Sequence, residues 1–248
     1  MRNVPTLLRR ELNAYFASVI GYTVIMFFLI VMGFVFCSVI GELLRSGPTQ
    51  ITVMQGFFYW FWLPSLFVIP AITMRLLAEE KRSGSIEMLM TAPVTDFEVV
   101  FSKWLGALTL YALMWALTGL YVWILRVLVS KGTGLDLGPI FSGYIGVLLI
   151  GQFLVAIGVL CSALTKNQVA AFLIAFALIF LFIIGVMFGS YFLRGTQSGK
   201  LFDSISAFEQ MVDFGRGLVD LRPLVLYASG TALALFLTTR IVESRKWR

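Results

Sequence analysis

The stretch VIGYTVIMFFLIVMGFVFCSVI, residues 19–40, contains no charged side chain and is long enough to cross a lipid bilayer as one helix. Further apolar stretches meet or approach that length at about residues 51–74, 104–129, 141–164, 169–193 and 223–239. Pro64 and Pro70 interrupt the second stretch, and Arg126 lies near the end of the third. The pattern predicts an all-α integral membrane protein with six transmembrane helices, in a single transmembrane domain over residues 1–248.

The composition supports this assignment and excludes several classes of chemistry. Apolar residues make up 59% of the chain and charged residues only 13%, with a mean hydropathy of +0.92, whereas soluble domains carry about a quarter charged residues. The chain has no histidine, the usual general base and metal ligand, and both cysteines lie in apolar stretches. We therefore expect no soluble enzyme, no catalytic residue and no metal site.

The basic residues predict an orientation in the membrane. If the N-terminus is cytoplasmic, the cytoplasmic segments hold twelve of the 19 Lys and Arg residues and the opposite segments hold seven. Because basic residues are enriched in cytoplasmic loops, both termini are expected in the cytoplasm. Residues 19–40 are too long for the apolar core of a signal peptide, so we expect that stretch to be retained.

Residues 1–18 predict an amphipathic helix in the plane of the membrane interface. Arg9, Arg10 and Glu11 are expected to face away from its apolar side. That apolar side comprises Leu7, Leu8, Leu12, Tyr15 and Phe16. The helix is either a basic anchor or an elbow that also touches a cytoplasmic partner.

The cytoplasmic segment at residues 75–103 is compact. The second span is expected to continue as a helix to about Lys81, and the glycine of Ser83–Ser85 breaks it. A short helix, Ile86–Met90, presents an apolar side, and the capping box Thr95–Glu98 starts the helix of the third span. The alternating charges of residues 79–82 are typical of a solvated helix end. The apolar side of the short helix, in contrast, needs a membrane surface or a docked protein to cover it.

The loop at residues 194–222 lies on the opposite face. Apolar residues at helical spacing and a second capping box, Ser206–Glu209, predict amphipathic helices that act as a passive surface or as a lid. The aromatic run at residues 57–62 either packs and anchors the bundle or lines a path for an amphipathic substrate.

Nothing in the sequence predicts an energy source inside the chain. The segment Gly195–Lys200 resembles a phosphate-binding loop only superficially, because three residues rather than four separate its glycines. No Asp or Glu lies within an apolar stretch, which argues against coupling to an ion gradient. Any energy for transport must therefore come from another protein.

Two stretches carry a resemblance to a known family. Residues 79–87, with Leu89 and Pro93, resemble the cytoplasmic segment of ABC-2-type transporter permeases, although Ser85 replaces the frequent threonine. Residues 208–222 and 243–248 are similar to the C-terminal part of the gliding-motility-associated branch. The order of elements agrees over essentially the whole chain.

The resemblance implies a permease subunit of an ATP-driven exporter in a bacterial inner membrane. Two permease chains, identical or related, would pair in the bilayer, and separate ABC ATPase subunits would carry the ATP and Mg²⁺. This chain would then need no cofactor of its own and no nucleic acid. The branch often occurs with an auxiliary membrane protein that has a large periplasmic domain.

The resemblance also implies where the ATPase docks. A coupling helix between the second and third spans would enter a cleft on the ATPase, with a secondary contact from the loop between the fourth and fifth spans. The residues expected at these contacts are Glu79, Glu80, Lys81, Arg82, Gly84, Ser85, Ile86, Glu87, Leu89, Met90, Lys166 and Asn167. The alternatives are a membrane scaffold or assembly subunit that transports nothing, and a lipid-modifying enzyme, for which no polar cluster is found.

Overall fold

A computed structural model describes residues 3–46, 53–84, 95–128, 136–193 and 195–244. The structure is 88% helical, and the described residues contain no β-strand, which confirms the all-α prediction. Six helical stretches are long and apolar enough to cross a membrane. They are Val19–Arg45, Trp62–Ser83, Asp96–Val127, Leu137–Leu164, Gln168–Phe192 and Leu221–Glu243.

Several of these stretches are divided into shorter helices. In chain order the elements are α1 (Val4–Phe16), α2 (Val19–Ser46), α3 (Val53–Tyr59), α4 (Trp62–Thr73), α5 (Ala78–Ser83), α7 (Asp96–Leu117), α8 (Gly119–Leu128), α9 (Leu137–Leu164), α10 (Gln168–Phe180), the π-helical turn η1 (Leu181–Gly185), α11 (Val186–Phe192), α12 (Gln197–Ile205), α13 (Ala207–Gly215) and α14 (Leu221–Glu243).

The second stretch differs from its predicted position at residues 51–74. Helix α3 ends at Tyr59, and the candidate span runs from Trp62 at the start of α4 to Ser83 at the end of α5. Pro64 lies in the first turn of α4, where backbone N–H groups have no partner within the helix, so proline costs no hydrogen bond there. Pro70 lies inside the same helix. Pro64 therefore marks the start of α4, and the helix continues past Pro70.

The third stretch begins where the capping box predicts. Glu98 N donates to Thr95 Oγ1 at 3.3 Å and Thr95 N donates to Glu98 Oε2 at 3.2 Å, which confirms the box. The helix then breaks at Thr118, whose hydroxyl donates to the carbonyl of Trp115 at 2.6 Å. Gly119 begins α8 after this break.

Helix α9 forms the centre of the bundle and contacts α4, α7, α10, α13 and α14. Glycines on α9 let its neighbours approach closely. A Cβ added at Gly151 would lie 2.1 Å from the Tyr111 ring, and one at Gly158 would lie 2.3 Å from Thr73 Oγ1. These contacts leave no room for a side chain, so the packing of α9 is fixed by its glycines.

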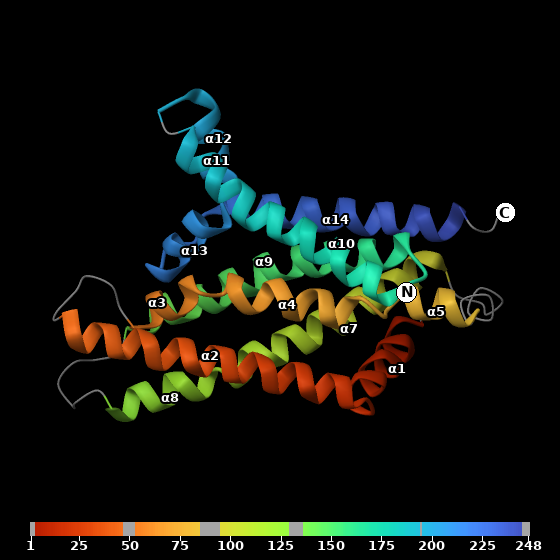
Figure 1. The fold of residues 1–248 in the computed structure, drawn as a ribbon, viewed down its shortest axis with the longest axis horizontal. Coiled ribbons are helices and arrows are strands. Elements are labelled where there is room, and N and C mark those ends of the chain that lie inside the picture. The colour runs from red at the N-terminus through yellow and green to blue at the C-terminus, as the bar shows by residue number, and fades with distance from the viewer. Residues whose placement is uncertain (1–2, 47–52, 85–94, 129–135, 194, 245–248) are drawn as a thin grey trace.

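Both chain ends lie at the same end of the bundle, where α1 and α5 also lie (Figure 1). We call this the terminal end. At the opposite end, α11 and α12 project away from the other helices, while α13 packs against α3 and α9. The hydroxyl of Ser206 accepts from Glu209 N at 3.5 Å, so the predicted N-cap of α13 is present.

The aromatic run at residues 57–62 contributes mainly to the core. Phe57, Phe58 and Phe61 are completely buried, whereas Tyr59 and Trp60 are exposed. The ring of Phe208 on α13 lies 6.3 Å from that of Phe61. The structure thus favours packing over the lining of a substrate path for most of this run.

The close approach at Gly151 gives a direct test of the packing. Gly151→Ala should destabilise the protein by about 1–3 kcal/mol, because the Tyr111 ring is fully buried and cannot move aside. Gly41→Ala is the matched control, since an added Cβ there meets nothing within 4 Å. Thermal unfolding of both variants in detergent measures the difference, and equal midpoints would contradict the proposed packing of α9.

Candidate functional site

The predicted ATPase contacts that the structure describes lie at the terminal end. Glu79, Glu80, Lys81 and Arg82 are on α5, and Gly84 is its C-cap, with a φ of 73° that favours glycine. Lys166 and Asn167 are exposed in the turn between α9 and α10. The remaining predicted contacts, Ser85, Ile86, Glu87, Leu89 and Met90, lie outside the described residues, as does the predicted helix that contains them.

The centre of this region is an ion pair network that the sequence analysis missed. Lys103 Nζ on α7 lies 3.0 Å from Glu11 Oε1 on α1 and 2.7 Å from Glu80 Oε1 on α5. The Lys103 side chain is only 1% exposed. Arg10 approaches the same two carboxylate oxygens from the solvent side, at 3.0 and 3.3 Å.

The network corrects the expectation for Glu11. Glu11 was expected to face away from the packed side of α1, with Arg9 and Arg10, but it is buried against α7. A Cβ added at Gly106 would lie 3.1 Å from Glu11 Cβ, so the two helices touch closely at this point. Lys103 lies near the start of an apolar helix, and a buried lysine needs an acidic partner. This need is the sequence signal that could have predicted a buried glutamate such as Glu11.

Tyr15 and Arg75 form a second link between α1 and the second span. The Tyr15 hydroxyl donates to the Ile72 carbonyl at 2.7 Å, and the Arg75 guanidinium lies 5.1 Å from the Tyr15 ring centre. Arg75 also donates to Ser18 Oγ at 3.0 Å. Burial, and secondarily the charge of Glu11, raises the pKa of Tyr15, so its hydroxyl stays protonated and available as a donor.

Helix α5 is also joined to the end of α9. Ser162 Oγ accepts from the backbone N–H groups of Leu77 and Ala78, each at 3.1 Å, and donates to the Met74 carbonyl at 3.0 Å. The buried Lys81 ammonium donates to the Ala163 carbonyl. Lys81 is therefore not part of a solvated helix end, as the alternating charges had suggested.

Asn167 has a local structural role in the turn that follows α9. Its side-chain oxygen accepts from Val169 N at 2.9 Å and caps α10. Lys166 beside it is exposed. Because α5 contacts both α9 and α10, the structure brings the two predicted contact regions to one surface of the terminal end.

A polar cavity of about 500 Å³ lies between α1, α5 and α7. Its charged lining residues are Arg10, Arg75, Lys103, Glu11, Glu79 and Glu80. Three basic and three acidic residues line it, so their formal charges balance. Glu80 Oε2 is buried and makes no hydrogen bond with the described residues.

Residues 66–245, well over half of the chain, match the family model described as ABC-2 family transporter protein. The chain belongs to the ABC-2 transporter family. The matched range contains α5, the turn at Lys166 and the ion pair partners Glu80 and Lys103, whereas α1 and α2 precede it. No curated protein matches the chain in sequence.

Membership of this family defines the general role of the chain. ABC-2 permeases are the membrane components of transporters, work with ABC ATPases and have no ATPase site of their own. The six apolar helices agree with a multi-pass membrane protein. The ion pairs and hydrogen bonds at the terminal end are therefore contacts within the membrane component of a transporter.

Lys103→Met tests the ion pair network of this permease. Removing the ammonium leaves Glu11 and Glu80 without their buried partner, so the free energy of unfolding should fall by about 3 kcal/mol. Arg10→Gln is the matched control, since Arg10 contacts the same oxygens but is half exposed, and it should change stability by less than about 1 kcal/mol.

Thermal unfolding in detergent measures both variants. Adding Glu11→Gln and Glu80→Gln to Lys103→Met removes the orphaned charges and should restore part of the lost stability. Equal effects of Lys103→Met and Arg10→Gln would show that the buried ammonium does not hold the three helices together.

Proposed function

We propose that this chain is the permease subunit of an ATP-driven ABC-2 exporter, in which α5 and the residues that follow it receive the movement of an ABC ATPase. The observation that carries the proposal is the buried pairing of Glu80 on α5 with Lys103 on α7. This pair connects a segment with the family's predicted contact residues directly to a transmembrane helix.

The contacts of α5 make it suited to transmit force. Glu80 connects α5 to α7, while Lys81 and Ser162 connect it to the end of α9. Each link is short, buried and polar, and a buried charge cannot leave its partner without a large loss of free energy. A displacement applied at Gly84 would therefore move the terminal ends of α7 and α9 together.

The arrangement of the complex follows from the family and from the charges. We infer two permease chains, identical or related, with both termini in the cytoplasm of a bacterial cell and the complex in its inner membrane. ATP and Mg²⁺ are bound by the ATPase subunits. Assignment to the gliding-motility-associated branch, with its auxiliary periplasmic partner, rests on the sequence resemblance at residues 208–222 and 243–248.

A replacement of residues 86–90, IEMLM, by glycine and serine tests ATPase docking. An ABC ATPase should copurify with the wild-type chain from gently solubilised native membranes and be lost from this variant, because the apolar contact side is removed. The matched control replaces residues 201–205, LFDSI, on α12 at the opposite end, and it should retain the ATPase. Mass spectrometry identifies the copurifying chains.

The same preparation distinguishes a transporter from a scaffold. Glu87→Lys should leave insertion in the membrane intact and lower the recovery of ATPase at least tenfold, since the charge of a contact residue is reversed. Absence of any ATPase from an intact wild-type preparation would favour the non-transporting scaffold. Retention of the ATPase by the variant of residues 86–90 would refute docking at this segment.

A further inference from the structure

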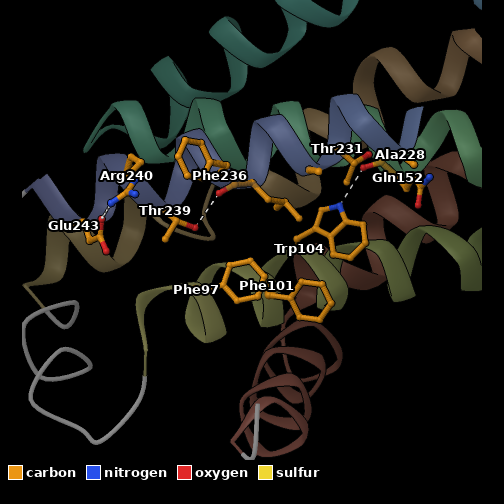
Figure 2. A pocket seen from close by; sticks show the side chains of 12 residues that line it. Phe97, Phe101, Trp104, Gln152, Ala228, Thr231, Phe236, Thr239, Arg240 and Glu243 are labelled. Atoms are coloured by element: carbon orange, nitrogen blue, oxygen red, sulfur yellow. Dashed lines mark hydrogen bonds and ion pairs between the residues drawn. The ribbon is translucent and has the colours of Figure 1, made fainter. Parts of the chain in front are cut away.

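A second cavity, of about 750 Å³, forms a groove between α7 and α14. Figure 2 shows its lining side chains, with the α7 aromatic residues facing α14 across the groove. Its lining includes Phe101 and Trp104 of α7, Gln152 of α9, and Ala228, Ala232 and Arg240 of α14. Both α7 and α14 belong to membrane-spanning stretches, so the groove lies along the bilayer.

The walls of the groove suit a hydrocarbon chain. On α7, the ring centres of Phe97 and Phe101 are 5.7 Å apart and those of Phe101 and Trp104 are 5.4 Å apart. The indole N–H of Trp104 donates to the Gln152 carbonyl at 3.0 Å, so its polar atom needs no partner in the groove. On α14, the small residues Ala228 and Ala232 leave space opposite the rings.

The length of the groove corresponds to one leaflet of a membrane. From Ala228 to Arg240 is 12 residues, or about 18 Å along an α-helix. Half of the hydrocarbon core of a bilayer is about 15 Å thick. An acyl chain that fills the groove would therefore place its head group near Arg240.

The terminal end of the groove carries the ion pair of Arg240 with Glu243. The Arg240 side chain is 62% exposed, lies with its guanidinium 5.1 Å from the Phe236 ring centre and pairs with Glu243 through Nη1 at 2.7 Å. A guanidinium has five N–H donors, so this pair leaves donors for an anion. In the sequence, residues 240–248 contain four basic residues and one acidic residue.

We propose that this groove binds one anionic phospholipid from the leaflet at the terminal end, with one of its two acyl chains between Phe101 and Ala232 and its phosphate at Arg240. Clusters of basic residues immediately after a transmembrane helix are typical of sites for anionic lipids. The apolar walls and the length of one leaflet suit an acyl chain, and the N–H donors of Arg240 that do not contact Glu243 suit the phosphate. The site is distinct from ATPase docking and does not depend on it.

Native mass spectrometry of the full chain in detergent, titrated separately with phosphatidylglycerol and phosphatidylcholine, tests the proposal. Phosphatidylglycerol should bind more tightly, and Arg240→Gln should weaken its binding about fivefold. The same variant should weaken phosphatidylcholine less, because the choline ammonium offsets the charge of that lipid's phosphate, so the preference between the two lipids should narrow. Arg222→Gln is the matched control, because Arg222 lies on the same helix at the opposite end and also has an acidic neighbour, Asp220, at 3.8 Å. It should leave both lipids unchanged.

A second pair of variants tests the acyl chain. Ala232→Trp fills the groove and should abolish the retained lipid, whereas Leu233→Trp, exposed on the same helix but outside the groove, should not. Equal binding of the two lipids, or lipid adducts that survive Ala232→Trp, would overturn the proposal. Loss of a dimer with Ala232→Trp, with lipid adducts unchanged, would identify a second copy of the chain as the occupant and would also overturn it.

Discussion

The terminal end of the bundle depends on the burial of one ammonium group, that of Lys103. A buried lysine that lost its partners would destabilise the fold by several kcal/mol, so α7 requires carboxylates at this position. They come from Glu11 and Glu80, which lie far from Lys103 in the sequence and on two other helices. A single atom on α7 therefore links α1 and α5, and the exposed Arg10 completes the charge balance.

The rest of the bundle is ordered by a different constraint, the glycines of α9. At Gly151 and Gly158 the neighbouring side chains occupy the space that a Cβ would need. Close approach of this kind is the usual way in which transmembrane helices associate, because lipid tails give no hydrophobic driving force for it. Ser162 and Ala163 at the terminal end of the same helix then bind α5 through polar contacts. The closely packed centre of the bundle and the residues that hold α5 are thus parts of one helix.

The sequence allowed the helical class, the number of spans and local signals such as Thr95 and Gly84 to be predicted, because hydropathy and capping act within a few residues. It misplaced the second span, because an aromatic run such as Phe57–Phe61 has the same hydropathy in a protein core as in lipid. It also missed the burial of Glu11 and Lys81. Their partners are on other helices, and a pattern along one helix cannot show which of its faces another helix will cover.

Helix α7 joins the ion pair network to the lipid groove. Phe97, Phe101 and Trp104 follow one another at intervals of four and three residues, which places them on one face of the helix, while Lys103 points to α1 and α5. A helix moves as a rigid rod over such short distances. Any displacement that α5 passes to Lys103 must therefore also shift the aromatic wall against α14, and a lipid held between them would resist or follow that shift. A lipid bound as we propose, with its phosphate at Arg240, would therefore respond to the position of α7 and connect the proposed coupling to the membrane.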